Sequence, residues 1–236
     1  MGRAFEYRRA TKEKRWDRMS KIFPKISRAI TVAVKENGSD PEMNAKLRAA
    51  IQNAKSQNMP KDNIDSAIKR ASDKDLSEFE EITYEGKGPY GVQIIIECAT
   101  DNPIRTTANI KSYFKKSNGL LVTPGSLEYM FERKSLFRIK NDYNINLEEL
   151  ELDLIDHGLE EIDIYNNELI IYGNFKNFGA LNKAIINKNL DVKKIQLKRI
   201  PKSPIEFSEE KLKEIENMID KIEEDDDVQA VFTNII

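Results

Sequence analysis

The sequence contains almost none of the residues on which metal sites and most nucleophilic enzymes depend: it has one histidine, one cysteine and one tryptophan among 236 residues. A structural zinc site needs four ligands, drawn mainly from cysteine and histidine, and Cys98 with His157 cannot supply them. A Ser-His-Asp triad would have to use His157, and nothing in the sequence places a nucleophile beside it. We therefore expect no metal, no cofactor and no enzymatic activity, with Cys98 in a hydrophobic core and His157 at the surface or at a helix end.

Long hydrophobic runs and paired cysteines are also missing. No segment approaches the ~20 apolar residues that a bilayer-spanning helix needs, so we expect no membrane partner. The N-terminal residues lack the apolar core of a signal peptide, and Glu6, Glu13 and Asp17 argue against a transit peptide. The single cysteine excludes an internal disulfide and suits a reducing compartment. These absences predict a cytoplasmic protein.

The net charge of −2 conceals two parts of opposite sign. Residues 1–71 carry 17 Lys/Arg and 8 Asp/Glu, a net of +9, whereas the remainder carries 21 and 32, a net of −11. The first twenty residues interleave arginine and lysine with Phe5, Tyr7 and Trp16, a composition suited to phosphate contacts and base stacking. The alternative is a solvated surface whose rings pack against the protein. The change of sign at a domain boundary favours an anionic partner.

The rest of the first third is predicted to be a three-helix bundle. Pro60, Asp62 and Asp65 suit the first turn of a helix. The residues that follow at helical spacing form one apolar stripe, Ile64, Ala67, Ile68 and Ala71. A helix over 41–57, capped by Asp40, repeats this spacing, and a third stripe runs over 22–33.

Several short strings in the sequence are more specific than its periodicity. In the helices these are Leu47-Arg-Ala-Ala-Ile51, Met59-Pro-Lys-Asp-Asn-Ile64 and Ala67-Ile-Lys-Arg70. Downstream they are Tyr84-Glu-Gly86, Gly88-Pro-Tyr-Gly-Val92, Glu97-Cys98, Thr100-Asp-Asn102, Arg105-Thr106 and Gly125-Ser126. On these strings the chain, over 21–236, resembles the YebC/PmpR family.

The resemblance implies a three-domain fold and a role in gene expression. The family comprises probable transcriptional regulators and includes mitochondrial translational activators. One departure concerns the N-terminus: most members begin with a Gly-His-Ser-Lys-Trp segment, whereas this chain has Gly2-Arg-Ala-Phe-Glu-Tyr-Arg-Arg9. Contacts assigned to that segment elsewhere therefore cannot be transferred to this chain.

The second domain is predicted to begin with strands over 82–85 and 92–99. The glycines between them suit a hairpin turn, since no strand–loop–helix context supports a phosphate-binding loop. A helix over 104–117 and a strand over 127–132 follow. This ββαβ unit lacks one helix and one strand, and we expect the helix at 208–222 and the strand at 228–233 to complete it. The acidic run 223–227 is predicted to be a solvated helix end.

Between these parts lies a complete unit with the order βαββαβ, which is the ferredoxin-like pattern. Its strands are predicted over 136–140, 161–165, 168–172 and 192–200, and its helices over 147–156 and 175–187. Asn166-Asn167 would form the central hairpin turn.

The predicted fold class is α+β, with an N-terminal three-helix bundle followed by two α+β ferredoxin-like domains, the second interrupted by the third. The expected boundaries are a basic arm over 1–20, a helical bundle over 21–76, domain two over 79–133 plus 204–236, and domain three over 134–203.

These features predict a monomeric, nucleic-acid-binding regulator of gene expression. The resemblance leaves open a DNA-binding transcriptional regulator and a ribosome-associated factor that binds ribosomal RNA and relieves stalling. No groove-reading motif is evident, and the aromatic-rich arm suits irregular RNA. A scaffold that docks an acidic protein is the alternative of another class. The candidate phosphate contacts are Arg3, Arg8, Arg9, Lys12, Lys14, Arg15, Arg18, Lys21, Lys25, Lys61, Lys69, Arg70 and Arg105.

Overall fold

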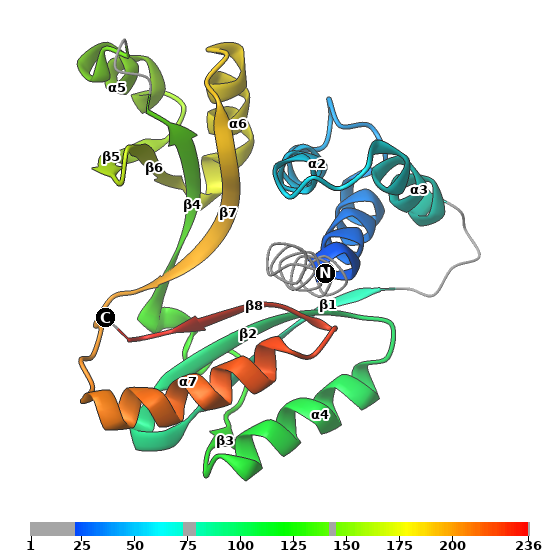
Figure 1. Ribbon diagram of the computed structural model, residues 1–236, viewed down its shortest axis with the longest axis vertical. Coiled ribbons are helices and arrows are strands. Elements are labelled where there is room, and N and C mark those ends of the chain that lie inside the picture. The colour runs from blue at the N-terminus through cyan, green and yellow to red at the C-terminus, as the bar shows by residue number, and fades with distance from the viewer. Residues whose placement is uncertain (1–21, 73–78, 142–144, 236) are drawn as a thin grey trace, which may run out of the picture.

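Three amphipathic helices form the first domain of the computed structural model, which describes residues 22–72, 79–141 and 145–235. They are the first helix (22–37), α2 (Ala45–Ser56) and α3 (Lys61–Ser72), seen on the right of Figure 1. Their apolar stripes meet in one core, as the sequence predicted. The buried members of that core are Ile30, Ala33, Val34, Leu47, Ala54, Met59, Ile64, Ala67 and Ala71.

The predicted start of the second helix was wrong by four residues, because a different side chain caps it. Asp40 only closes a turn, its carboxylate accepting from the amide of Glu42 at 2.9 Å. Asn44 is the N-cap of α2 and accepts from the amide of Leu47 at 3.0 Å. Its side-chain amide, buried at 1% exposure, also donates to the carbonyls of Ala33 and Gly38. One asparagine therefore fixes the angle between the first helix and α2.

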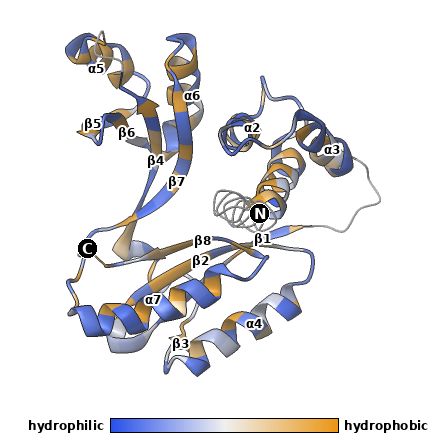
Figure 2. Ribbon diagram, viewed as in Figure 1, coloured by the Kyte–Doolittle hydropathy of each residue, from blue (hydrophilic) through white to orange (hydrophobic). Residues whose placement is uncertain are grey.

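The second domain is a four-stranded sheet in the order β3-β1-β2-β8. Its strands are β1 (Glu80–Lys87), β2 (Gln93–Thr100), β3 (Leu120–Leu121) and β8 (Val228–Thr233). Helices α4 (Pro103–Lys116) and α7 (Glu209–Glu223) cover one face. Figure 2 shows hydrophobic residues concentrated in β2 and β8, with mixed colouring on the two covering helices. The C-terminal helix and strand therefore complete this sheet, as the sequence predicted, with β8 paired to β2.

The strand predicted over 127–132 is wrong for its first four residues, since β4 (Phe131–Lys140) begins only at Phe131. A 3₁₀ turn at Glu128–Met130 occupies its place, and the short β3 is the third strand instead. The carboxylate of Glu85, 5% exposed, accepts from the amides of Gly125 and Leu127 at 2.7 and 2.5 Å and holds this segment in a turn. Leu127 then packs with Ile95 on the sheet face opposite α4 and α7. The apolar residues that suggested a strand are thus buried although residues 127–130 form no strand.

The third domain has the predicted ferredoxin-like order, with strands arranged β5-β6-β4-β7. Its elements are β4 (Phe131–Lys140), α5 (Leu147–Ile155), β5 (Leu159–Tyr165), β6 (Glu168–Asn174), α6 (Phe178–Asn187) and β7 (Val192–Pro201). The turn between β5 and β6 is Asn166-Asn167, both at positive φ, as a tight two-residue hairpin requires. The second domain reaches the same strand order with β1 in the place of β6, so its strands follow a permuted chain order.

Strand β4 runs across the boundary predicted at 133/134. It pairs with β7 from Phe131, opposite Pro201, to Ile139, opposite Val192. Phe131 packs in the second domain, whereas Phe137 and Ile139 lie in the core of the third. The two long strands therefore form the connection between the sheets, visible in Figure 1 as the ribbons that descend toward β8.

Deleting residues 208–236 should unfold the second domain. The deletion removes the buried side chains Ile215, Met218, Ile222 and Val228, each worth roughly 1.5–3 kcal/mol, and exposes β2 as an edge. We expect aggregation or loss of the cooperative unfolding transition in size-exclusion chromatography and thermal melts. A matched pair of point variants refines the test: Ile222→Ala should cost about 2–5 kcal/mol, and Ile104→Ala, at an 85% exposed position, less than about 0.5 kcal/mol. A monomeric, cooperatively folded truncation would show that this tail is an appendage.

Candidate nucleic-acid interface

The predicted phosphate contacts divide into three groups. Arg3, Arg8, Arg9, Lys12, Lys14, Arg15, Arg18 and Lys21 lie outside the described residues. Lys61, Lys69 and Arg70 lie at the two ends of α3, while Lys25 and Arg105 take part in contacts with the C-terminal part of the chain. The structure therefore does not gather the described candidates into one patch.

The three cations of α3 are exposed and lie outside its buried stripe, with Lys61 in the first turn and Lys69 and Arg70 in the last. Arg70 donates to the carbonyl of Ser66 at 3.2 Å, and none of the three forms an ion pair with a described residue. Lys69 and Arg70 occupy the last turn, where cations also stabilise the helix dipole. These side chains are available to a partner, and a role in helix stability is the competing explanation for two of them.

Lys25 joins the first helix to α7. Its Nζ donates to the carbonyl of Glu223, in the last turn of α7, at 2.6 Å. Burial lowers the pKa of Lys25 below 10.5, although the charges of Glu223, Asp226 and Asp225 oppose this effect. Lys25 is therefore an interdomain contact and not a freely exposed cation.

Arg105 belongs to a network around a buried carboxylate, Asp227. Its guanidinium donates to both carboxylate oxygens at 3.1 and 2.8 Å, and Arg28 of the first helix pairs with the same group at 3.2 Å. The hydroxyls of Thr106 and Thr100 donate at 2.7 and 3.2 Å. Burial alone would raise the pKa of Asp227, but the hydrogen bonds from Arg105 and Thr106 and the charges of Arg105 and Arg28 hold it below 3.8.

This network corrects the prediction of a solvated acidic run at 223–227. Asp227 is 2% exposed, and Asp225 accepts from Asn109 and Tyr113 of α4 at 3.1 and 3.0 Å. Only part of the run faces solvent. Its last residue, Asp227, bonds to side chains of the first helix, α4 and β2, and it directly precedes β8.

The thiol and imidazole side chains offer no catalytic arrangement. Cys98 is buried in the second core, and this burial raises the pKa of its thiol to about 12. His157 is exposed next to the end of α5. Among the described residues, no group of three or more His, Cys, Asp and Glu side chains is placed to hold a metal ion. No described helix is long and apolar enough to cross a bilayer.

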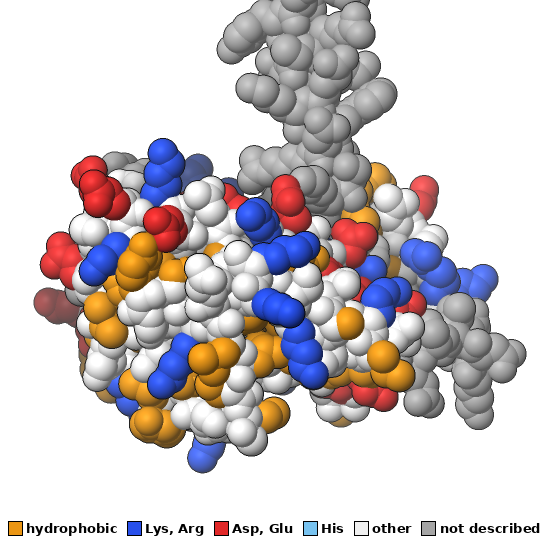
Figure 3. All heavy atoms as spheres, turned by 90° about the horizontal axis from the view of Figure 1, so that it is seen from below, with side chains coloured by type: hydrophobic (Ala, Val, Ile, Leu, Met, Phe, Trp, Pro, Cys, Tyr) orange, Lys and Arg blue, Asp and Glu red, His pale blue; other side chains and the backbone are white. Residues whose placement is uncertain are grey.

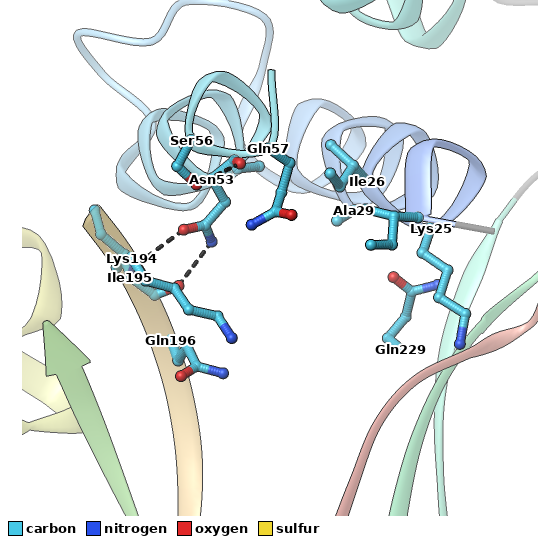
Figure 4. Close-up of a pocket in the computed structure, with 12 residues that line it drawn as sticks. Lys25, Ile26, Ala29, Asn53, Ser56, Gln57, Lys194, Ile195, Gln196 and Gln229 are labelled. Carbon is cyan, nitrogen blue, oxygen red and sulfur yellow. Dashed lines mark hydrogen bonds between the residues drawn. The ribbon is translucent and has the colours of Figure 1, made fainter. Parts of the chain in front are cut away.

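Two adjoining pockets of ≈370 and ≈540 Å³ form a groove between β7 and β8. Gln196 of β7 and Gln229 of β8 line both pockets, and we call the combined feature the β7–β8 groove. The first helix and α2 close one end, where Lys25 and Lys194 line the space (Figure 4). Asn53 of α2 fixes this end, because its amide exchanges hydrogen bonds with the backbone of Ile195 at 2.7 and 2.9 Å.

Further basic residues, on β4 and β7, are not among the phosphate contacts predicted from the sequence. These strands place three like-charged pairs directly opposite one another: Arg133 with Arg199, Lys134 with Lys198 and Arg138 with Lys194. The signal in the sequence is the alternation of 194, 196 and 198 along a strand, which puts three polar side chains on one face. Charge counting overlooked it because the two-thirds of the chain after residue 71 carry net negative charge.

The face seen from below has a mixed character. Figure 3 shows lysine and arginine side chains in a narrow band near the middle, with acidic side chains mostly toward the edges and hydrophobic ones between. Charges of both signs share this surface. It is therefore a weaker candidate for a polyanion than α3 or the β7–β8 groove.

Comparison with known proteins agrees with this architecture. Residues 3–74 match the family described as TACO1/YebC protein N-terminal domain, and residues 79–235 match TACO1/YebC second and third domain. The chain belongs to the TACO1/YebC family.

Members of the TACO1/YebC family resemble this chain over its whole length. A protein named probable transcriptional regulatory protein from Helicobacter hepaticus is 62% identical over 240 residues, with both chains fully covered. One of the same name from Wolinella succinogenes is 60% identical over 236 residues, again with full coverage. The crystal structure of a conserved hypothetical protein from Aquifex aeolicus aligns with a TM-score of 0.79 at 33% identity, covering 92% of this chain and 90% of that one. The recognition of the YebC/PmpR family from short strings is thereby confirmed.

In this TACO1/YebC chain, Asp227→Asn should destabilise the fold by about 3 kcal/mol. The neutral amide leaves Arg105 and Arg28 without their common counter-charge, and their partial exposure puts the cost at the lower end for a broken buried pair. Because the folded-state pKa of Asp227 lies below 3.8, the wild-type contribution is complete above that pH and disappears as the pH falls through the folded-state pKa. Urea unfolding between pH 7 and pH 2.5 measures both effects. The exposed neighbour variant Asp226→Asn is the control, and equal stability of the two variants would refute the role of Asp227.

Proposed function

We propose that this protein is a nucleic-acid-binding regulator of gene expression that acts as a cytoplasmic monomer and not as an enzyme. The observation that carries the proposal is the set of exposed cations on α3, which form no ion pair with any described residue, in a first third that has a net charge of +9. Phosphate contacts from such side chains supply most of the sequence-independent affinity of nucleic-acid-binding proteins. The relatives named probable transcriptional regulatory proteins support a role in regulation.

The choice between DNA and RNA depends on what α3 presents to a ligand. Its first turn carries Asp62 beside Lys61, and Asp65 is also exposed, so carboxylates outnumber cations at the end of the helix that would enter a DNA groove. The cations of its last turn suit contacts along a backbone better than the reading of base edges. This distribution favours a sequence-tolerant ligand, as in the ribosome-associated alternative.

The salt dependence of binding tests the electrostatic part of the proposal. If about six phosphates are neutralised, a plot of log K against log salt should have a slope near −5 for duplex DNA and roughly −4 for a single strand. Fluorescence anisotropy titrations at salt concentrations from about 50 to about 300 mM give this slope. Binding that does not change with salt would contradict the proposal, and an acidic protein as the captured ligand would favour the scaffold.

Reversing Lys61, Lys69 and Arg70 to glutamate should weaken binding at least about tenfold at ~0.1 M salt and reduce the slope by roughly 2–3. The matched control is the triple reversal of Lys111, Lys115 and Lys116, which are exposed on α4 and also include the last turn of a helix. Circular dichroism separates the competing explanation. If the α3 variant loses helicity while its residual folded fraction binds normally, these cations serve the helix dipole and not a ligand.

A further inference from the structure

We propose that the β7–β8 groove holds the backbone of single-stranded nucleic acid, with Lys194 and Lys198 in its lining as phosphate contacts, Arg138 opposite Lys194 adding positive charge beside it, and Tyr172 as a base-stacking ring. This inference rests on the proposed function, because it adds a second contact surface for the same class of ligand. It differs in position from α3 and involves residues of the third domain.

Three cations of β4 and β7 have little or no counter-charge among the described residues. Of the three like-charged pairs between β4 and β7, one is relieved by local partners: Arg199 pairs with Glu97 at 2.9 Å, and Arg133 lies 3.7 Å from the ring centroid of Phe175. Lys134 pairs with Glu160 at 3.1 Å. Arg138 has only Glu168 at 3.9 Å, and Lys194 and Lys198 form no ion pair with a described residue. The mutual repulsion of these three cations would be relieved by a bound anion.

The pKa shifts agree with this geometry. Burial, followed by the charge of Arg138, lowers the pKa of Lys194 below 10.5. Burial, followed by the charges of Arg138 and Lys194, lowers the pKa of Lys198 in the same way. Like charges directly opposite on neighbouring strands destabilise a sheet. A phosphate between the strands would reverse that contribution.

The lining of the groove is rich in hydrogen-bond donors and cations. Gln196 and Gln229 lie in both pockets, and the side-chain nitrogen of Gln229 is buried without a hydrogen-bond partner among the described residues. Figure 4 shows Gln229 and Lys25 on the side of the space opposite Lys194 and Gln196. Glu223 is the acidic residue among the described lining residues, and it lies at the end near Lys25. Donors and cations therefore face the groove from both sides.

The size of the two pockets and the position of Tyr172 suit a single-stranded ligand. Each pocket has a volume within the range of small-molecule sites, which suits single nucleotides held one after another along the groove. Tyr172 of β6, paired with Leu136, lies on the sheet face away from α5 and α6 and lines the larger pocket. An aromatic ring on the open face of a four-stranded sheet, beside cations, is the arrangement on which single-stranded bases stack.

The experiment compares full-length variants for binding to a fluorescein-labelled oligouridylate of about fifteen nucleotides. Lys194→Glu with Lys198→Glu should weaken binding about tenfold or more and reduce the single-strand salt slope by roughly 1.4. Lys176→Glu with Lys183→Glu makes the same charge change at exposed positions near and on α6 and should stay within about twofold. Tyr172→Ala should lose roughly fivefold or more without changing the slope, and Tyr172→Phe should keep wild-type binding.

The double variant Lys194→Glu with Lys198→Glu, called the groove variant, also carries an internal control for folding. Glutamate at 194 lies opposite Arg138 and replaces a repulsion by an attraction, so the melting temperature should equal or exceed that of the wild type. Loss of binding in a variant of undiminished stability supports the groove.

The outcomes separate this inference from the proposed function. If the wild type binds and the α3 triple variant loses binding while the groove and α6 variants behave alike, the groove is refuted and the proposed function stands. If the groove variant loses binding and the α3 variant does not, the groove is the principal site. If the wild type binds neither the oligouridylate nor duplex DNA, both proposals fall.

Discussion

The arrangement of the domains depends on one buried carboxylate. Moving a charged group out of water costs several kcal/mol unless ion pairs and hydrogen bonds replace its hydration. Asp227 obtains this compensation from three separate parts of the chain: Arg28 in the first helix, Arg105 and Thr106 in α4, and Thr100 at the end of β2. Because removing any of these elements takes away part of this compensation, Asp227 favours one relative position of the first domain and the two halves of the second.

That position creates the groove. The backbone carbonyl of Asp227 accepts from the amide of Ala99 at 2.8 Å, directly before β8 begins to pair with β2. Arg199 pairs with Glu97 of β2 from the third domain, and Asn53 binds the backbone of β7 from the first. These contacts use backbone and side-chain groups along the edge strand β7, which would otherwise be open to pairing with another chain. The space left between the two edge strands is lined by lysines and amides.

Periodicity in the sequence predicted the architecture well, because each core is built from regular stripes of aliphatic residues. The three-helix core, the βαββαβ order and the return of the C-terminal helix and strand all followed from spacing. Two of the failures share a physical cause, which is a polar side chain that bonds across a long sequence separation. Glu85 binds Gly125 and Leu127 and replaces a predicted strand by a turn, and Asp227 is buried by partners more than a hundred residues away. Spacing within a segment carries no information about such partners.

The candidate site shows the same limit in electrostatic terms. A count of charges along the chain identifies the basic first third, but it averages β7 with the acidic residues around it and hides the cross-strand pairs. In three dimensions the two effects act together. The net negative charge of the remaining chain would repel a polyanion from most of the surface, while Lys194, Lys198 and Arg138 would attract it at one place. Repulsion elsewhere increases the selectivity of a binding surface as effectively as attraction within it. An acidic body is thus compatible with a nucleic-acid ligand, because it would confine such a ligand to α3 and the β7–β8 groove.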